Sequence, residues 1–564
     1  MLLSVAGDLL LFSVTGLGWG MFFATWIRGF SPLDRLSLGL AGAVVGCYLA
    51  SFACYWLHLP PAALWLFVFT GCAAVLRRRG AIGELGRDGT LRGALRHWAT
   101  LVGWCLGWQA LVISYSGGGW SGDWQEHYDR AHFFLQHWPT DHLFNGLYPL
   151  PARPPLANLV GGGFLGLVGG AFFHFQVFST LLATLVYFPL AGLVQKLRPG
   201  AHPQALLLGL LMLSPLLVQN ATFPWTKLPA AFFIVLAVGL LTRPPLAETA
   251  RALTFALVAL AAALLTHYSA APWILAGGVA WVAVNRALWS SSAHRRGLLL
   301  GAAAGTMLFM TWLGWSLATY GASFTFTANS STGLAAVTTL AERASHTLGN
   351  LYRTLVPAWL WEGMPPLLQQ SSWLARLRDQ WFCLYQLNLP FAFGLGGFAV
   401  LVRLLLARAR SRDPEFRFWR LAGPLVIVIT AAVTPPDALG LTHIILQPLV
   451  LLGLAWLAAS AHTLPAFWTR LWVAGLAVDF IFGLVLQFGV QSLWLDRWLN
   501  PGHREIDYII QLSQPAAANY YGKLRIGAVH LAAGVPPAVA LLLLGAGAGW
   551  ALAALRSSAP ARQP

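Results

Sequence analysis

The chain has 564 residues, of which 57% are hydrophobic and only 10% are charged, and its formal net charge is +16. Soluble globular domains carry about 25% charged residues, so this composition excludes an ordinary soluble enzyme and a disordered chain. The positive charge is divided among short segments between apolar runs and is not gathered on one face. We therefore expect no nucleic-acid partner.

Apolar runs recur along the whole chain, each of about 20 residues, the length that an α-helix needs to cross a bilayer. Hydropathy predicts about fifteen crossings, over residues 5–27, 35–57, 62–77, 97–115, 175–195, 205–220, 228–242, 251–266, 270–288, 297–319, 388–408, 420–434, 441–459, 466–487 and 530–555. We interpret the Gly-rich segment 156–174 as interfacial or re-entrant. The expected fold is an all-α polytopic membrane protein with one transmembrane domain, 1–564, of roughly 13–15 helices and with interfacial helices on its outer face.

The basic residues predict how the chain is oriented in the membrane. Of the 35 lysines and arginines, 24 fall on one set of alternating loops and 11 on the other. The positive-inside rule assigns the first set to the cytoplasm, so we expect the N-terminus outside and the C-terminus inside. The outer face then carries the three long loops, 116–174, 320–387 and 488–529, and most of the acidic residues. We expect any chemistry on these loops.

The first outer loop contains the densest group of chemically active side chains, in the sequence SGGGWSGDWQEHYDRAHFF at 116–134. A helix that begins at 123 places Asp123, Glu126, His127 and Arg130 on one face. One interpretation is an amphipathic helix on the membrane surface, capped by Asp123 and with a Glu126–Arg130 pair. The other is a site for a polar ligand, which we favour because such groups are costly to bury near a membrane.

Other polar side chains stand at the predicted outer ends of helices. Arg153 precedes Pro154-Pro155, and Lys227 begins an apolar segment in NATFPWTKLPAAFF. Both fit either an anchor at the membrane interface or a site for an anionic ligand. His267 and Tyr268 occupy the short turn THYSAAPW, and His443 follows in TPPDALGLTHIILQP. These three fit either ordinary packing or a site.

Two further predictions concern the rest of the chain. Loop 320–387 mixes polar and apolar residues and could cover a site as a lid. Asp8 and Asp479 fall within apolar segments, where a carboxylate is costly. We expect each of them to pair with a polar neighbour.

Several short motifs resemble those of the GT-C superfamily of membrane glycosyltransferases, namely GDWQEHYDRA, RPPL, WTKLPAAFF, THYSAAPW and THIILQP. The most similar relatives are the protein O-mannosyltransferases and the bacterial lipid A aminoarabinose transferase. The resemblance covers residues 97–460. It departs from the mannosyltransferases because Asp123 and Glu126 are not adjacent.

The resemblance implies an enzyme of the bacterial inner membrane with a polyprenyl-phosphate sugar as donor. Sugar transfer to a hydroxyl acceptor, with inversion, would take place on the outer, periplasmic side, and the acceptor would be a glycan, a lipid or a protein. The implied catalytic residues are Asp123, as the base, and Glu126. The implied substrate-binding residues are His127, Arg130, Arg153, Lys227, His267, Tyr268 and His443. Membrane lipids are the other expected partners. The resemblance makes no cofactor certain, although a divalent metal could be bound because some relatives use one, and the sequence leaves metal ligands unknown.

Three alternatives stay open. A transporter or flippase of a lipid-linked or anionic solute would use the same outer cations but would also need charges near the middle of the membrane. A polymerase or ligase of lipid-linked glycans would rely on outer arginine and histidine without an early acidic motif. A scaffold would give no reason for the polar cluster at 123–130.

Overall fold

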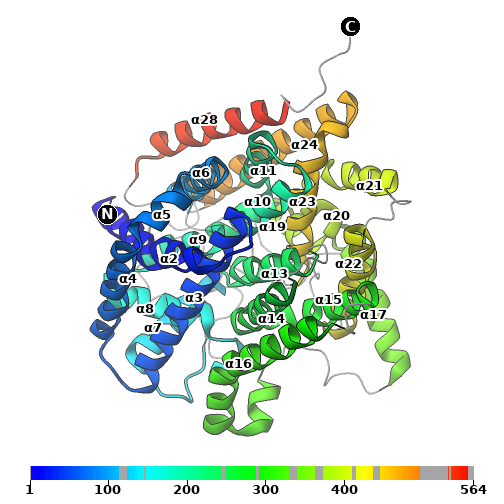
Figure 1. Cartoon of the computed structure of the whole chain (residues 1–564). Helices are drawn as coiled ribbons and strands as arrows, with labels where there is room; N and C mark the ends of the chain where they lie inside the picture. The colour runs from blue at the N-terminus through cyan, green and yellow to red at the C-terminus, as the bar shows by residue number, and fades with distance from the viewer. Residues whose placement is uncertain are drawn as a thin grey trace.

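The computed structural model describes residues 2–112, 123–144, 148–242, 249–286, 291–328, 339–362, 373–408, 414–435, 445–495, 531 and 535–556. Across these residues the chain is built from helices and has no β-strand (Figure 1). One isolated antiparallel bridge joins Phe144 to Tyr148. The predicted all-α fold class is confirmed.

The first part of the chain forms a group of helices around the long helix α3. In order these elements are α1 (Leu2–Phe12), the π-helix η1 (Ser13–Gly18), α2 (Trp19–Trp26), α3 (Pro32–Trp56), the 3-10 turn η2 (Pro61–Leu64), α4 (Trp65–Arg77), α5 (Arg79–Gly86) and α6 (Gly89–Leu111). Helix α3 begins where its sequence favours a start, because Ser31 caps the backbone N–H of Asp34 and Pro32 occupies the first turn.

The middle of the chain contains the elements that carry most of the predicted site residues. These are α7 (Asp123–Gln136), the 3-10 turn η4 (Leu150–Ala152), α8 (Leu156–Val168), α9 (Phe172–Thr184), α10 (Tyr187–Leu197), α11 (Ala201–Leu213), α12 (Pro215–Thr222), α13 (Lys227–Leu241), α14 (Thr249–Thr266), η5 (Tyr268–Ala270) and α15 (Ala271–Val284). Nearly every residue of α13 is buried, and this helix lies at the centre of the bundle (Figure 1). It packs against α9, α10, α14 and α23. A helix that is apolar on all sides belongs in such a position.

The last part of the chain completes the bundle and adds outlying helices. The elements are α16 (Ser292–Thr327), α17 (Leu340–Leu355), α18 (Trp359–Glu362), α19 (Trp373–Leu387), α20 (Leu389–Ala392), α21 (Gly397–Arg408), α22 (Pro414–Val433), α23 (Gln447–Ser460), η9 (Ala461–Thr463), α24 (Ala466–Leu484), the π-helix η10 (Val485–Leu495) and α28 (Pro537–Arg556). Helix α28 lies beside α6, α11 and α24 (Figure 1). Most of the predicted outer loop 488–529 lies outside the described residues.

Six helices among the described residues are long and apolar enough to cross a membrane. They are Leu2–Trp26, Pro32–Trp56, Phe172–Leu197, Ser292–Thr327, Ala466–Val490 and Pro537–Arg556. Two bent helix pairs raise the number to eight if each pair is one span. The chain is therefore a multi-pass membrane protein, while the count of roughly 13–15 crossings stays a prediction.

Two predicted crossings are broken, which corrects the sequence analysis. Segment 205–220 bends by 69° where α11 meets α12, because Ser214 caps the N–H of Leu217 and Pro215 starts a new helix. Segment 388–408 is interrupted between α20 and α21. Gly394 and Gly396 have φ values of +83° and +80° there, which glycine adopts without strain.

The two carboxylates within apolar helices have polar partners, as predicted. Asp8 of α1 lies 2.7 Å from Nδ1 of His174 at the start of α9. Asp479 of α24 accepts hydrogen bonds from the hydroxyl of Tyr385 and, at 2.9 Å, from the backbone N–H of Leu395. The second contact satisfies the backbone at the break between α20 and α21, so Asp479 is explained by the local fold.

Candidate active site

Helix α7 is packed inside the protein and does not lie on the membrane surface. Gly162 of α8 allows close contact, because a Cβ there would lie 2.5 Å from the carbonyl oxygen of Ala131. The apolar face, which a surface helix would turn towards the membrane, is buried, with Ala131 at 0% and Phe134 at 5% exposure. The amphipathic surface-helix interpretation is therefore wrong. The polar face of α7 is also buried, and this face forms the site.

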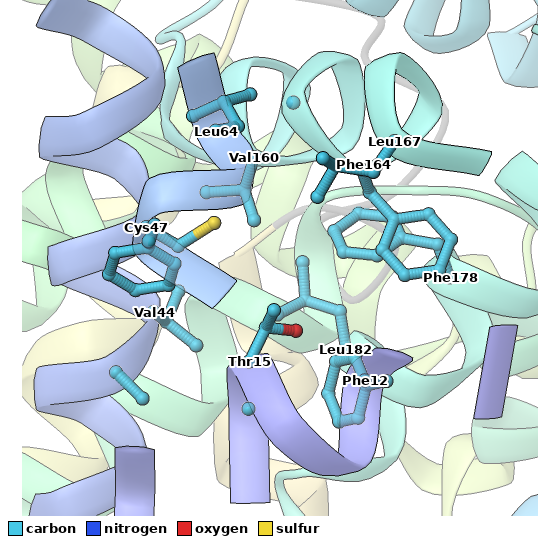
Figure 2. Close-up of a pocket in the computed structure, with 14 residues that line it drawn as sticks. Phe12, Thr15, Val44, Cys47, Leu64, Val160, Phe164, Leu167, Phe178 and Leu182 are labelled. Carbon is cyan, nitrogen blue, oxygen red and sulfur yellow. The ribbon is translucent and has the colours of Figure 1, made fainter. Parts of the chain in front are cut away.

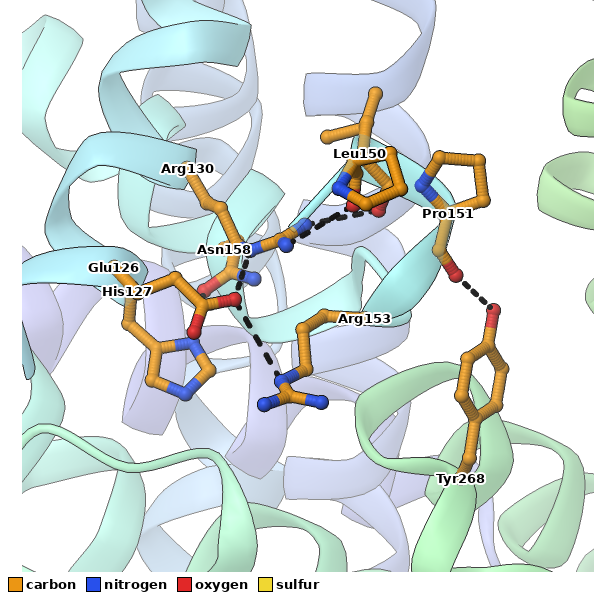
Figure 3. Close-up of polar contacts among 9 residues, drawn as sticks. Glu126, His127, Arg130, Leu150, Pro151, Arg153, Asn158 and Tyr268 are labelled. Atoms are coloured by element: carbon orange, nitrogen blue, oxygen red, sulfur yellow. Dashed lines mark hydrogen bonds and ion pairs between the residues drawn. The ribbon is translucent and has the colours of Figure 1, made fainter. Parts of the chain in front are cut away.

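Glu126 and two arginines form the centre of the site (Figure 3). Oε1 of Glu126 accepts from Nε of Arg130 at 2.8 Å and lies 3.6 Å from Nε of Arg153. Glu126 and Arg130 are each about 1% exposed, whereas Arg153 is 19% exposed. Burial raises the pKa of the Glu126 carboxyl, but the charges of Arg153 and Arg130 outweigh that effect and hold its pKa below 4.5. Glu126 is thus ionised at neutral pH.

The proline-rich segment before Arg153 is fixed on two sides. Arg130 donates from Nη1 to the carbonyl of Leu150 at 2.9 Å and from Nη2 to that of Pro149 at 3.2 Å. From the other side, the Tyr268 hydroxyl donates to the carbonyl of Pro151 at 3.2 Å. These bonds compensate for a segment that cannot form a regular helix. They also fix the backbone from which Arg153 extends (Figure 3).

His127 is a neutral, buried imidazole with a defined orientation. Its Nδ1 lies 3.1 Å from Oδ1 of Asn158, an atom that can only accept, so the proton is on Nδ1. Burial, with the charges of Arg153 and Arg130, lowers the pKa of His127 to about 3. At neutral pH its Nε2 therefore presents a lone pair and accepts hydrogen bonds.

His267 has the opposite tautomer. The backbone N–H of Ser269 donates to Nδ1 of His267 at 3.1 Å, which leaves the proton on Nε2. Burial, followed by the charges of Arg153 and Lys227, lowers the pKa of His267 well below 6.5. The charges of both cations therefore act on this imidazole. His267 presents an N–H donor where His127 presents an acceptor.

Lys227 extends from the first residue of the central helix α13. Its Nζ lies 3.4 Å from the ring centre of Trp225, a cation–π contact, and its side chain is buried. Trp225, Thr226, His127 and Asn158 all line one small cavity, which is also lined by residues of α9. Helix α19, from the predicted lid loop, approaches this cavity through Phe382, whose ring centre lies 6.2 Å from that of Trp225.

The structure brings together most of the residues that the sequence indicates. The residues that meet are Glu126, His127, Arg130, Arg153, Lys227, His267 and Tyr268. Asp123 begins α7, but its side chain lies outside the described part of the structure, as does His443. Within the described residues no three His, Cys, Asp or Glu side chains gather as metal ligands, so a divalent metal stays a prediction.

Two residues of the site were not predicted from the sequence. Asn158 orients His127, and Trp225 contacts Lys227. Each of them nevertheless has a feature in the sequence that could have indicated a site residue. Asn158 is a polar residue inside an apolar helix and lies five positions after Arg153, and Trp225 is the aromatic nearest Lys227 in the sequence. Neither feature of the sequence identifies the residue that is contacted. Asn158 and His127, for example, are 31 residues apart.

Comparison with solved structures finds similarity to ArnT from Cupriavidus metallidurans, the lipid A aminoarabinose transferase, a GT-C enzyme. The structure bound to undecaprenyl phosphate has a TM-score of 0.47 and 16% identity, over 83% of this chain and 76% of that chain. The apo structure has a TM-score of 0.44 with the same identity and coverage. No protein-family model and no curated protein matches the chain.

Proposed function

We propose that the chain is a GT-C-type glycosyltransferase that moves a sugar from a polyprenyl-phosphate donor to a hydroxyl acceptor. The observation that carries the proposal is that Arg153 lies 3.6 Å from the buried Glu126, and that the charges of Arg153 and Lys227 both act on the buried His267. The two cations come from segments 74 positions apart in sequence, and both lie at the start of apolar helices. A lipid phosphate carries its charge at the membrane surface, which is where the ends of membrane helices are expected.

The cations have a defined role in this reaction. As the bond between the anomeric carbon and the phosphate oxygen breaks, its electron pair goes to the phosphate, and negative charge grows there. Arg153 and Lys227 would stabilise that charge by charge-assisted hydrogen bonds. Arg153 is held in place for this by Glu126 and by the fixed proline-rich segment.

Asp123 is the proposed base, and Glu126 is a positioning residue. Glu126 is a weak base because two arginines lower its pKa and occupy its oxygen. Asp123 is the first residue of α7, three positions earlier, and residues at this spacing are expected on the same face of a helix. It would take the proton of the acceptor hydroxyl while that oxygen attacks the anomeric carbon from the side opposite to the phosphate, which inverts the configuration.

The two histidines suit the recognition of sugar hydroxyls. A hydroxyl donates one hydrogen bond and accepts others, and the site offers Nε2 of His127 as acceptor and Nε2–H of His267 as donor. We propose that both contact the transferred sugar. The reaction would take place on the periplasmic side of the bacterial inner membrane, with a glycan, a lipid or a protein as acceptor.

Purified wild type and Asp123→Asn, assayed with a panel of radiolabelled polyprenyl-phosphate sugars and isolated membranes as acceptor, test the proposal. We expect transfer by wild type and a loss of about 100-fold or more in the variant, the contribution of a general base. Thermal unfolding of both proteins serves as the control, and equal stability is expected because asparagine caps a helix about as well as aspartate does.

Each result has a clear meaning. Transfer that persists in an equally stable Asp123→Asn protein would remove Asp123 as the base and leave the enzyme class intact. Donor binding without transfer to any acceptor would contradict the enzyme and favour a transporter of the lipid-linked sugar.

A further inference from the structure

The last turn of the short helix α12 is held by polar side chains from other helices. Nε2 of Gln109 in α6 donates to the carbonyl of Thr222 at 2.8 Å. The hydroxyl of Thr180 in α9 donates to the carbonyl of Ala221 at 3.0 Å. Carbonyl groups at the end of a helix have no partner within that helix, so these two contacts satisfy the backbone where the bent pair α11–α12 ends.

Two further contacts involve side chains of α12, and the backbone does not require them. Nε2 of Gln386 in α19 donates to Oε1 of Gln219 at 2.6 Å. Nε2 of Gln447 in α23 donates to Oδ1 of Asn220 at 2.7 Å. These four amide side chains are fully buried, at 0% exposure. The four consecutive residues 219–222 are thus bonded to four different helices, and we call Gln109, Thr180, Gln386 and Gln447 the polar collar of α12.

Helix α9 directs its collar residue towards α12. Phe178 and Leu182 of α9 face a space that is lined mainly by apolar side chains (Figure 2). Thr180 lies midway between them in the sequence, and a residue two positions from each points to the opposite side of a helix. The hydroxyl of Thr180 therefore meets α12 and not the apolar space.

Stability alone does not explain the polar collar. Among the described residues, Oε1 of Gln109 and Nε2 of Gln219 have no hydrogen-bond partner. A buried amide atom without a partner costs free energy, and apolar side chains would fill the same space without that cost. Hydrogen bonds are directional, however, so the collar defines one position for the end of α12.

A stiff connector joins the end of α12 to the candidate active site. Its sequence is Phe-Pro-Trp-Thr at 223–226, and Lys227 follows as the first residue of α13. Pro224 fixes its own φ, and the backbone N–H of Trp225 donates to the carbonyl of Phe223 at 2.6 Å. Because Nζ of Lys227 lies 3.4 Å from the centre of the Trp225 ring, a displacement of α12 would move this cation.

We propose that the polar collar consists of positioning residues, which set the place of Lys227 through the last turn of α12. The inference rests on the proposed function, in which Lys227 binds the lipid phosphate, and adds the residues that hold this cation in place. The collar residues act through α12 and do not themselves contact the donor. Loss of a collar bond leaves Lys227 in the protein but displaces it from Trp225.

Lysine NMR of the full-length protein in detergent tests the position of Lys227 without any donor. The chain has three lysines, Lys196, Lys227 and Lys523, so lysine labelled with 13C at Cε gives three signals, and Lys227→Met assigns one of them. The Trp225 ring shifts the Lys227 signal upfield. We expect Thr180→Val, which removes the hydroxyl and keeps the side-chain shape, to reduce that shift. Thr180→Ser retains the hydroxyl and should restore it.

A second collar variant and a matched control accompany this test. Gln109→Met removes the bond to Thr222 and should also reduce the upfield shift. Gln204→Met makes the same change in α11, the other half of the bent pair, where the buried amide of Gln204 donates to Gln195 at 3.4 Å. This control should leave the Lys227 signal unchanged. All variants are compared at equal thermal stability, and a collar variant that does not fold leaves the other decisive.

Affinity for a polyprenyl phosphate separates a positioning role from a merely structural one. Gln109→Met should weaken binding about twofold to tenfold, the contribution of a typical hydrogen bond. In a protein that already carries Lys227→Met, the same change should add no further loss, because the cation that the collar positions is absent. A merely structural role would weaken binding by the same factor in both proteins.

Two results would overturn the inference. One is a Lys227 signal that neither Thr180→Val nor Gln109→Met changes. The other is an equal loss of affinity on Gln109→Met with and without Lys227→Met. A wild-type protein that neither binds the polyprenyl phosphate nor transfers sugar would contradict the proposed function instead, and the lysine signals would still decide whether the collar positions Lys227.

Discussion

Glu126 joins two arginines in the interior, and its removal should be costly. Deleting one partner of a buried ion pair leaves an uncompensated charge and costs about 3–5 kcal/mol. We expect Glu126→Ala to lower the free energy of unfolding by about that amount. Glu362→Ala is the control, because Glu362 pairs with Arg353 at 3.4 Å but is about 40% exposed, and such pairs contribute less than about 1 kcal/mol. Chemical unfolding in detergent measures both. Equal losses of unfolding free energy in the two variants would contradict the contribution of the buried ion pairs of Glu126.

The lowered pKa of His127 predicts how the stability of the folded protein depends on pH. Its pKa is about 3 in the folded protein and 6.5 in the unfolded chain, so the unfolded state binds the proton first. Stability attributable to this group is constant above pH 6.5 and falls as the pH is lowered from 6.5 towards 3. At pH 5 the loss amounts to roughly 2 kcal/mol.

We expect His127→Gln to reduce this acid-dependent loss, measured as the difference in unfolding free energy between pH 7.5 and pH 5. His267 contributes in the same direction, so the slope should fall without vanishing. An unchanged slope would mean that His127 is protonated, or accessible to protons, in the folded protein.

Individual residues also show how far the sequence alone can predict the site. The carboxylates, histidines and cations were recognisable because polar groups are rare in this chain. Their partners were not, since Asp8 meets His174 across 166 residues and Tyr385 meets Asp479 across 94. Local spacing predicts i,i+4 contacts such as Glu126–Arg130, and only the packing of helices decides the distant ones.

The contact between α7 and α8 positions the site. Gly162→Ala would place a methyl group 2.5 Å from the carbonyl of Ala131 and push the two helices apart. We expect a loss of about 1–3 kcal/mol in the free energy of unfolding, the usual cost of overpacking. Gly103→Ala in α6 is the control, because nothing lies within 4 Å of the new methyl group. That change should be neutral or stabilising by about 0.4–1 kcal/mol. Thermal unfolding compares the two, and equal behaviour would contradict the close α7–α8 packing.

Helix boundaries were predictable where the sequence carries a start or stop signal. The break at Ser214-Pro215 has such a signal, a capping residue followed by proline, but hydropathy alone concealed it. Burial of α7 was not predictable, because its polar face is typical of a surface helix. Helix α8 supplies the surface against which α7 packs, and the sequence does not indicate which helix the glycines of α8 contact.

For the whole molecule, the asymmetry of basic residues supports the proposed orientation. We expect a reporter that is active only in the cytoplasm to be active when fused after residue 564 and inactive when fused before Met1. The same reporter placed in the short basic segment 286–296 provides an internal positive control. The reverse pattern at the two termini would place the polar site on the cytoplasmic side and contradict a periplasmic reaction.

The class of molecule followed from composition, since long apolar runs leave few alternatives to a helical membrane bundle. The number of crossings did not, because several apolar helices are shorter than a span or bent within it, such as Lys227–Leu241 and Ala250–Thr266. Their lengths are set by neighbouring helices and not by the bilayer alone.

The central claim is that the convergent cations bind a lipid phosphate. Affinity of the purified protein for a polyprenyl phosphate tests it most directly, with Lys227→Met compared with Lys196→Met. Lys196 is the control because it pairs with Asp34 at 3.3 Å, away from the site. A hydrogen bond to a charged group contributes about 1.5–3 kcal/mol, so Lys227→Met should weaken binding by about tenfold or more while Lys196→Met leaves it unchanged. Equal affinities of the two variants and the wild type would contradict the account.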